Sequence, residues 1–403
     1  MGSSTGTAER SAHERGIQVL LDVDSQPASK LPPRKYLREY DALLASYRRP
    51  SSLYSGWQLA STLALFVASW TGMYLSLSIS YWLTLTLALP TSLLVVRLFI
   101  FQHDCGHRSF FRSKLANDMV GFVLGVLTFT PYHSWRREHA AHHACSGNLD
   151  RRRISGEILT MTVDEYREAS WYERLYYRVY RHPLILFVIG AFIQFVIRQR
   201  CTYQLPKTWK KERRSVHLTN LALVVAAIGV SWLVGPWEFL ITEGPVMMLA
   251  AGVGVWLFYV QHQYEDAFWE RREDWDYVQA AMAGSSYYRL PKVLQWFTGS
   301  IGLHHIHHLD SRIPNYRLQQ CHDAHPELQQ VTEFSLLESI SCIRAKLWDE
   351  EQHKMVGFAA ANTPPSTRMI SSQPNSARRP SGMRHRPARV PCASDRSSVT
   401  DHQ

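Results

Sequence analysis

Four runs of apolar residues, arranged in two pairs, constrain the fold of this 403-residue chain more than any other feature of its sequence. The first pair spans residues 57–77 and 82–101, and the second pair spans residues 218–236 and 246–261. These lengths approach the roughly 20 residues that an α-helix needs to cross the hydrocarbon core of a bilayer. The sequence therefore predicts an all-α membrane protein with four transmembrane helices in two hairpins.

Two shorter apolar runs, at residues 120–132 and 184–197, contain 13 and 14 residues. Runs of this length more often lie in the membrane interface or pack against protein than cross the bilayer. We therefore expect both segments to be interfacial. For 184–197 there is a second reason, because a further crossing would place the histidine groups before and after it on opposite faces of the membrane.

The distribution of basic residues predicts the orientation of the helices. Seven basic residues lie between Arg198 and Arg214, whereas the loops between paired runs, at 78–81 and 237–245, contain no Lys or Arg. Basic segments of membrane proteins tend to stay on the cytoplasmic side. We therefore expect a multi-pass protein with both termini on the cytoplasmic side, a cytoplasmic helical cap that holds the histidines, and two short outer loops.

The chain divides by composition into three parts. Residues 1–34 form a polar N-terminal arm without the apolar core of a signal peptide. Residues 35–345 are expected to form the membrane domain, and residues 346–403 a C-terminal extension. From about residue 360 the extension is rich in Ser, Pro and Arg, which predicts disorder. This tail carries half of the net charge of +10 and no Phe, Tyr or Trp, so we expect it to contact anionic lipid and not nucleic acid.

The 19 histidines are unevenly distributed, and three groups of them stand out. The first group is HDCGH at 103–107, the second is HAAHH at 139–143, and the third is HHIHH at 304–308. On a helix, positions i, i+3 and i+4 share one face, so each group presents two or three imidazoles to one point. His305 is displaced by about 100° from His304 and need not join them.

Eight imidazoles in these groups have a spacing suited to metal coordination. Neutral imidazole binds Fe, Zn, Cu or Ni, and no group presents a thiolate at the spacing of a zinc finger. A catalytic zinc ion takes about three protein ligands, so eight imidazoles predict two metal ions. The predicted ligands are His103, His107, His139, His142, His143, His304, His307 and His308.

The residues around the three groups resemble those of the membrane fatty acid desaturases. FQHDCGHRSFF, EHAAHHACSGNLDRR and GLHHIHHLDSRIPNYRL are similar to the three histidine boxes of the acyl-lipid, Δ12/ω-6-like branch of that family. The resemblance covers about residues 35–345. It implies that the eight histidines hold two Fe ions in a non-haem di-iron centre, which uses O2 to introduce a cis double bond into a fatty acyl chain. An acyl-lipid is the favoured substrate.

The resemblance also suggests residues beyond the three groups. The family often has a further imidazole after the fourth membrane helix, and VQHQYED supplies His262 there, as a ninth ligand or as a residue behind the ligands. Four carboxylates adjoin the boxes, where they would accept the free N–H of a ligating imidazole or else form surface salt bridges. They are Asp104, Glu138, Asp150 and Asp310.

The electrons for such a reaction must come from another protein. The chain contains no GxGxxG dinucleotide fingerprint, no four-cysteine iron–sulfur pattern and no HPGG-type haem segment. The resemblance implies a ferredoxin or a cytochrome b5-like protein as the separate electron donor.

Two other functions stay open at the level of the sequence. A hydroxylase, ketolase or acetylenase that acts on a lipid or carotenoid would carry the same histidine boxes, and the mass of the product would distinguish it. A membrane metal transporter would place ionisable residues near the middle of its membrane helices. The four apolar runs contain no His, Asp or Glu in their middles, which argues against transport. The sequence does not define the oligomeric state.

Overall fold

The computed structural model describes residues 40–152 and 156–362. The predictions for the arm at 1–34 and for the tail beyond residue 362 lie outside these residues. Within the described part, four helices are long and apolar enough to cross a membrane. They are α3 (Ser52–Ser76), α4 (Tyr81–His107), α9 (Lys210–Val234) and α10 (Pro236–His262), and the short turn η1 (Ala45–Tyr47) precedes them. The prediction of an all-α membrane protein with two helical hairpins is confirmed.

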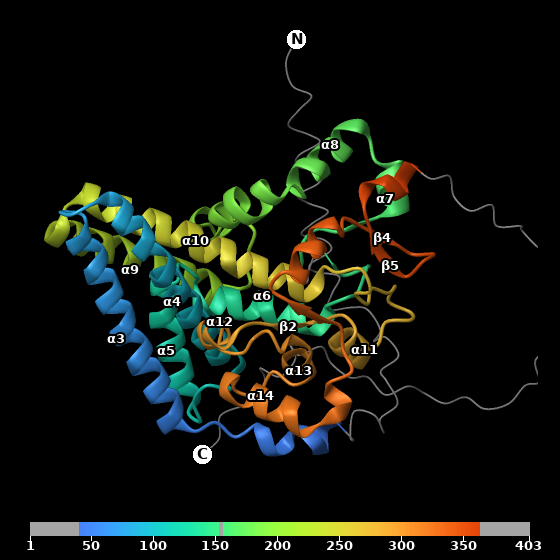
Figure 1. Cartoon of the computed structure of the whole chain (residues 1–403), viewed down its shortest axis with the longest axis horizontal. Coiled ribbons are helices and arrows are strands. Elements are labelled where there is room, and N and C mark those ends of the chain that lie inside the picture. Colours follow the sequence, from blue (N-terminus) through green and yellow to red (C-terminus); the bar gives the residue numbers. More distant parts are fainter. Residues whose placement is uncertain (1–39, 153–155, 363–403) are drawn as a thin grey trace, which may run out of the picture.

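The two hairpins pack together into one four-helix unit, with α4 against α10. At the end where each hairpin turns, the Tyr81 hydroxyl donates to the Ile241 carbonyl at 3.2 Å, and Trp70 Nε1 donates to Glu243 Oε2 at 3.1 Å. Figure 1 shows both turns at the left of the view and most of the short helices and strands at the right. The rest of the chain therefore covers the end of the unit that lies opposite the hairpin turns.

The turn between α9 and α10 is shorter than predicted. The sequence indicated an outer loop at 237–245, whereas α10 begins at Pro236 and includes all of these residues. Gly235 alone separates the two helices, and its backbone φ of 100° is one that glycine adopts readily. Proline needs no N–H partner at the first helical position, so the helix begins directly after the turn.

Both central helices continue past their apolar runs. The apolar run of α4 was expected to end at residue 101, but the helix reaches His107. The apolar run of α10 was expected to end at residue 261, and the helix reaches His262. The added residues 102–104 are polar, yet they are buried because the cap covers them. The two membrane helices thus carry polar side chains directly into the cap.

Residues 120–132, predicted to be interfacial, lie mostly in helix α5 (Lys114–Leu127). This helix packs against α4 and buries Leu124, while Met119 is exposed on its other side. Apolar side chains on both sides suit a helix that contacts protein on one side and lipid on the other. A short turn leads into α6 (Tyr132–Cys145), which contains the second histidine group.

The segment between α6 and α9 contains the second predicted interfacial run. Its elements are β1 (Met161–Thr162), α7 (Val163–Glu168), α8 (Trp171–Tyr180), the π-helical turns η2 (Ile185–Gly190) and η3 (Ile193–Ile197), and η4 (Arg198–Arg200). The run at 184–197 forms η2 and η3, and the helical stretch that contains them is bent by 71° from α8. Its first part, η2, packs against α10.

The C-terminal part of the described chain covers the end of the four-helix unit. Its elements are α11 (Tyr277–Met282), β2 (Tyr287–Arg289), α12 (Lys292–Phe297), α13 (His304–Leu309), α14 (Asn315–Ala324), η5 (Pro326–Leu328), β3 (Glu333–Ser335), η6 (Glu338–Arg344), β4 (Leu347–Asp349), β5 (Lys354–Val356) and η7 (Phe358–Asn362). Strands β2 and β3 pair in parallel, while β4 pairs with β1 in parallel and with β5 antiparallel.

The folded part of the chain extends beyond residue 345, where the C-terminal extension was predicted to begin. Leu347, Trp348 and Met355 in β4 and β5 are buried, and β4 pairs with β1 from the middle of the chain. Strands of 3 residues are too short to show an alternating pattern in the sequence. This is why the sequence did not predict that these residues are folded.

A buried arginine ties three of these segments together. The Arg181 side chain donates to the carbonyls of Leu159 and Ala345, to the Gln263 side chain and to the Tyr259 hydroxyl. None of the carboxylates in the described residues forms an ion pair with it. Neutral oxygen atoms therefore satisfy this charge, and they fix the chain where it leaves α10.

Candidate metal centre

The three histidine groups lie on helices that meet at the cap end of the four-helix unit. His103 and His107 lie near the end of α4, one helical turn apart, and His262 is the last residue of α10. The second group lies on α6 and the third on α13. Because α4 and α10 are candidate membrane helices, the histidines lie directly at the end of the apolar unit.

Nine histidines of the described chain form two clusters, each of which could hold a metal ion. Cluster 1 contains His103, His107, His139, His143 and His307. Cluster 2 contains His142, His262, His304 and His308. Within each cluster, one nitrogen atom from every residue lies within 4.8 Å of the others. The structure thus brings all eight predicted ligands together and places His262 among them.

The imidazoles of each cluster direct their Nε2 atoms toward a common centre. In cluster 1, His143 Nε2 is 3.1 Å from the Nε2 atoms of both His139 and His307. In cluster 2, His262 Nε2 is 3.0 Å from His304 Nε2. A neutral imidazole has only one N–H, so converging nitrogen atoms cannot all satisfy one another by hydrogen bonds. A metal cation can bind all of these lone pairs at once, and imidazole suits iron.

The burial and protonation of these histidines also fit a metal site. The Nε2 atoms of His103 and His107 are buried and have no hydrogen-bond partner among the described residues. Burial, reinforced by neighbouring imidazoles, lowers the pKa of five ligands outside the membrane helices well below the usual 6.5. These are His139, His143, His304, His307 and His308. They are therefore neutral at pH 7, which is the form that binds a metal.

Metal-free protein is expected to lose stability as the pH falls below about 6.5. Histidines of the unfolded chain bind protons near that pH, whereas the buried imidazoles of the folded chain bind them only at much lower pH. Below pH 6.5 the unfolded state binds more protons, so the free energy of unfolding falls. Thermal unfolding of chelator-treated protein in detergent should give a lower Tm at pH 5.5 than at pH 7.5. An equal or higher Tm at pH 5.5 would contradict this.

Asp104 is the predicted carboxylate that contacts a ligand. Its Oδ1 accepts a hydrogen bond from His103 Nδ1 at 3.2 Å. Its Oδ2 accepts from the backbone and side-chain amides of Asn315, both at 2.9 Å. His262 has a similar partner, because its Nδ1 donates to the Gly284 carbonyl at 3.0 Å. In both residues the bond at Nδ1 leaves Nε2 free to face a cluster.

The other three predicted carboxylates do not contact a cluster histidine within the described residues, and two of them form the salt bridges that were the alternative prediction. Glu138 is exposed on α6 and forms no hydrogen bond to an imidazole within the described residues. Asp150 accepts from Arg271 Nη1 at 2.8 Å, and the buried Asp310 pairs with Arg312. Adjacency in sequence does not determine the direction of a side chain, so the sequence alone could not choose between the imidazole and the salt bridge for these carboxylates.

Replacing Asp104 by asparagine is expected to weaken iron binding by about 10- to 100-fold, as is typical for partners that orient a metal-ligating histidine. An amide presents an N–H where the carboxylate now accepts from His103 or from Asn315. Glu138→Gln is the matched control, since Glu138 neighbours a ligand in sequence but is exposed. Iron affinity, measured by competition with a chelator, should fall only for Asp104→Asn. Equal affinities for both variants and the wild type would exclude the orienting role.

Trp135, which contacts a ligand, and Gly106, which lies against Trp135, were not predicted. The Trp135 ring stacks on His139 at a centroid distance of 4.5 Å and an interplanar angle of 17°. Gly106 permits this arrangement, because a Cβ at this position would lie 2.9 Å from Trp135 Cζ3. The glycine within HDCGH was a possible signal of close approach. Nothing in the sequence identified Trp135 as its neighbour.

His305 lies outside both clusters, as its position on the helix predicted. It is fully buried, and its Nε2 donates to the Leu328 carbonyl at 2.9 Å. Burial lowers the pKa of His305 to about 3, so the side chain is neutral. It is a core residue on the same helix as three of the cluster histidines.

The fold and the two clusters define an integral membrane protein with two groups of histidines that could hold metal ions. The family model described as fatty acid desaturase matches residues 77–334, a region that includes all nine cluster histidines. The chain therefore belongs to the fatty acid desaturase family, as its histidine boxes predicted. It is a desaturase, an enzyme of lipid metabolism.

Named relatives agree with this assignment. A fatty acid desaturase of Bacillus subtilis (strain 168) is 44% identical over 317 residues, which are 79% of this chain and 89% of the relative. An sn-1 oleoyl-lipid 12-desaturase of Picosynechococcus sp. is 28% identical over 327 residues, 74% of this chain and 86% of the relative. An sn-1 acyl-lipid omega-3 desaturase (ferredoxin) of Synechocystis sp. is 30% identical over 238 residues, 56% of this chain and 63% of the relative.

Proposed function

We propose that this desaturase introduces a cis double bond at a Δ12/ω-6-like position of an acyl-lipid, with two iron ions held by the nine histidines. Cluster 1 would hold one ion and cluster 2 the other. The observation that carries this proposal is the division of the imidazoles into clusters of five and four. Each cluster has enough ligands for one ion, which supports two ions and not one.

The chemistry of the reaction explains why such a centre is needed. Desaturation removes two hydrogens from a pair of unactivated methylene groups, which no acid or base in this chain can accomplish. Two bound iron ions would supply the oxidising chemistry, with O2 as the co-substrate. The residues of the chain hold and orient this centre: Asp104 and the Gly284 carbonyl fix the rings of His103 and His262. Burial of all four histidines of cluster 2, and of His103 and His307 in cluster 1, limits the access of bulk water.

Two relatives support the substrate and the electron donor. One is named for an sn-1 oleoyl-lipid, and the other for an sn-1 acyl-lipid and for ferredoxin. We infer that this chain also acts on an acyl-lipid and receives electrons from a separate ferredoxin or cytochrome b5-like protein. Purified enzyme with the reduced donor should then consume O2 only when the acyl-lipid is present.

We further propose that the metal centre and both termini lie on the cytoplasmic side. The hairpin of α9 and α10 separates the second histidine group from the third, and the two groups share both clusters. A crossing by the bent stretch from α8 to η4 would place these groups on opposite faces. The basic segment 198–214 lies at the cap end, where α9 contacts α6. The catalytic domain in this proposal spans residues 35–345, with residues 346–362 packed against it.

Cys201 offers a test of this orientation. It is exposed between η4 and α9, whereas the other described cysteines are buried. In a variant with Cys392→Ser, a membrane-impermeant maleimide should label Cys201 only after the cells are permeabilised. Cys201→Ser is the control for labelling at other positions. Labelling of Cys201 in intact cells would place the cap on the outer side.

The product identifies the reaction. Fatty acid methyl esters from a host that expresses this chain should contain a new unsaturated species, two mass units lighter than its precursor, in gas chromatography–mass spectrometry. The double variant His142→Ala/His307→Ala, which removes a ligand from each cluster, should not form it. The position of the bond tests the Δ12/ω-6-like assignment directly. A product that gains oxygen would instead indicate a hydroxylase, and unchanged acyl chains without bound iron would contradict the di-iron centre.

A further inference from the structure

A basic hollow lies at the cap end of α9, apart from the metal centre. It has a volume of about 360 Å³ and is lined by Lys207, Lys210, Arg213, Arg214, His217 and Leu218. Arg213 is held in place, since its Nη1 donates to the Thr202 and Leu205 carbonyls at 2.7 and 3.1 Å. None of the four Lys and Arg side chains forms an ion pair with a carboxylate in the described residues. The hollow thus concentrates positive charge without an internal counterion.

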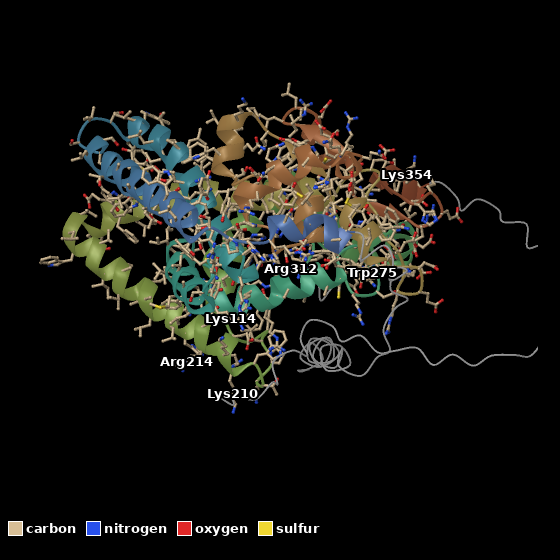
Figure 2. All side chains as sticks on the ribbon, turned by 90° about the horizontal axis from the view of Figure 1, so that it is seen from below. Lys114, Lys210, Arg214, Trp275, Arg312 and Lys354 are labelled. Carbon is tan, nitrogen blue, oxygen red and sulfur yellow. The ribbon has the colours of Figure 1, made fainter. Side chains whose placement is uncertain are left out.

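The acidic residue nearest in sequence lies on the other side of the helix. Glu212 is the single carboxylate between residues 198 and 218, and it pairs with Arg137 of α6 at 3.2 Å. The Arg137 guanidinium also lies 3.9 Å from the centroid of the Trp209 ring. The first turn of α9 is therefore fixed to α6 on one side, while the basic side chains face outward on the other. Figure 2 shows Lys210 and Arg214 pointing away from the molecule at this end of α9.

The same face of α9 continues from the hollow as an apolar stripe. Lys210, Arg214 and His217 are spaced by four and three residues, as one helical face requires. The stripe continues this spacing with Leu218, Leu221, Val225, Ile228 and Trp232, whose exposed fractions range from 41% to 84%. A helix face that is basic at the membrane boundary and apolar beyond it matches a molecule with an anionic head and apolar chains.

We propose that the hollow binds the phosphate headgroup of an anionic phospholipid whose acyl chains lie along the apolar stripe of α9. This inference goes beyond the desaturation reaction and does not depend on the iron centre. The chemistry that the hollow recognises is a phosphate anion. The stripe selects a membrane lipid over a soluble phosphate, because a soluble ligand would gain nothing from apolar side chains beside the hollow.

Binding can be tested on the full chain, purified in detergent and titrated with single lipids in native mass spectrometry. Phosphatidylglycerol should bind at least about tenfold more tightly than phosphatidylcholine. Lys210→Gln/Arg214→Gln should weaken phosphatidylglycerol binding by about 30-fold, the effect expected for two basic residues at an anionic headgroup. The charge-retaining variant Lys210→Arg/Arg214→Lys should bind it like the wild type.

Two controls define the result. Arg289→Gln/Lys354→Gln removes two other cations, and Figure 2 shows Lys354 at the right of the view, away from Lys210 at the bottom; lipid binding should not change. Equal Tm values for all variants show that they are folded. Three results would overturn the proposal: equal affinity for the two lipids, unchanged binding by Lys210→Gln/Arg214→Gln, or displacement of the lipid by glycerol 3-phosphate at similar concentration. Loss of donor-dependent turnover with unchanged lipid binding would assign the hollow to the donor instead.

Discussion

Replacing His307 by glutamine is expected to abolish formation of the unsaturated product and to reduce bound iron from about two ions per chain to about one or fewer. His307 belongs to cluster 1, and its Nε2 lies 3.1 Å from that of His143. Even residues that only orient a ligand contribute about 10- to 100-fold to metal affinity or activity. Loss of a ligand itself should therefore lower iron affinity or activity by at least about 100-fold. Iron can be measured by mass spectrometry of the purified protein, and the product by gas chromatography.

His305→Gln is a closely matched control for this experiment. Both histidines are buried on α13, but His305 faces the Leu328 carbonyl and lies outside the clusters. Glutamine keeps an N–H donor there, so the cost should be limited to about 1 kcal/mol of stability. Iron and product should be retained. Product formation by His307→Gln at the wild-type level, or loss of iron from both variants alike, would contradict the assignment of ligands.

Replacing Gly302 by alanine is expected to cause a similarly large loss through packing and not through coordination. Gly302 lies two residues before His304, and a Cβ at this position would overlap the carbonyl oxygen of Tyr288. The two backbones are joined here, since Tyr288 N–H donates to the Gly302 carbonyl at 2.8 Å. The clash therefore has to displace backbone, which costs about 3 kcal/mol or more. A shift of about 1 Å at the third histidine group would lower activity by about 100-fold.

The measurement compares Gly302→Ala with Gly229→Ala. A Cβ on Gly229 of α9 would meet no atom within 4 Å. That variant should keep the Tm, the iron content and the product of the wild type, because alanine favours a helix more than glycine does. Gly302→Ala should lower the Tm by about 5 °C or more. A Gly302→Ala protein with normal Tm and product would contradict this prediction. It would show that β2 and the residues before α13 can move apart without loss of stability.

Local patterns were sufficient to predict the features that depend on one helix at a time. The four membrane helices follow from the length of the apolar runs, and the spacing within each histidine group predicted which imidazoles share a face. His305 illustrates this, since a displacement of about 100° on the helix places it outside both clusters. The meeting of the three groups was an inference from chemistry, because metal coordination requires it.

Features that depend on contacts between distant segments could not be predicted in this way. Asp104 and Glu138 each neighbour a histidine of the boxes, but only Asp104 meets a partner such as Asn315, which lies more than 200 residues away. The turn at Gly235 depends on one positive φ that no periodicity reveals. Strands β4 and β5 are stabilised by β1 from the middle of the chain, so their sequence alone resembled an extension.

The composition of the two clusters also determines at which point of synthesis the ligands of each cluster are all present. Cluster 1 joins His103 to His307, and cluster 2 joins His142 to His308. Neither set of ligands exists until the third histidine group has been synthesised, which is after all four membrane helices. The entropy cost of closing such long loops grows slowly with their length, and metal binding at the end can offset it. In the proposed di-iron enzyme, iron would therefore act on the last step of maturation, the closure of the cap, and insertion of the helices would not require it.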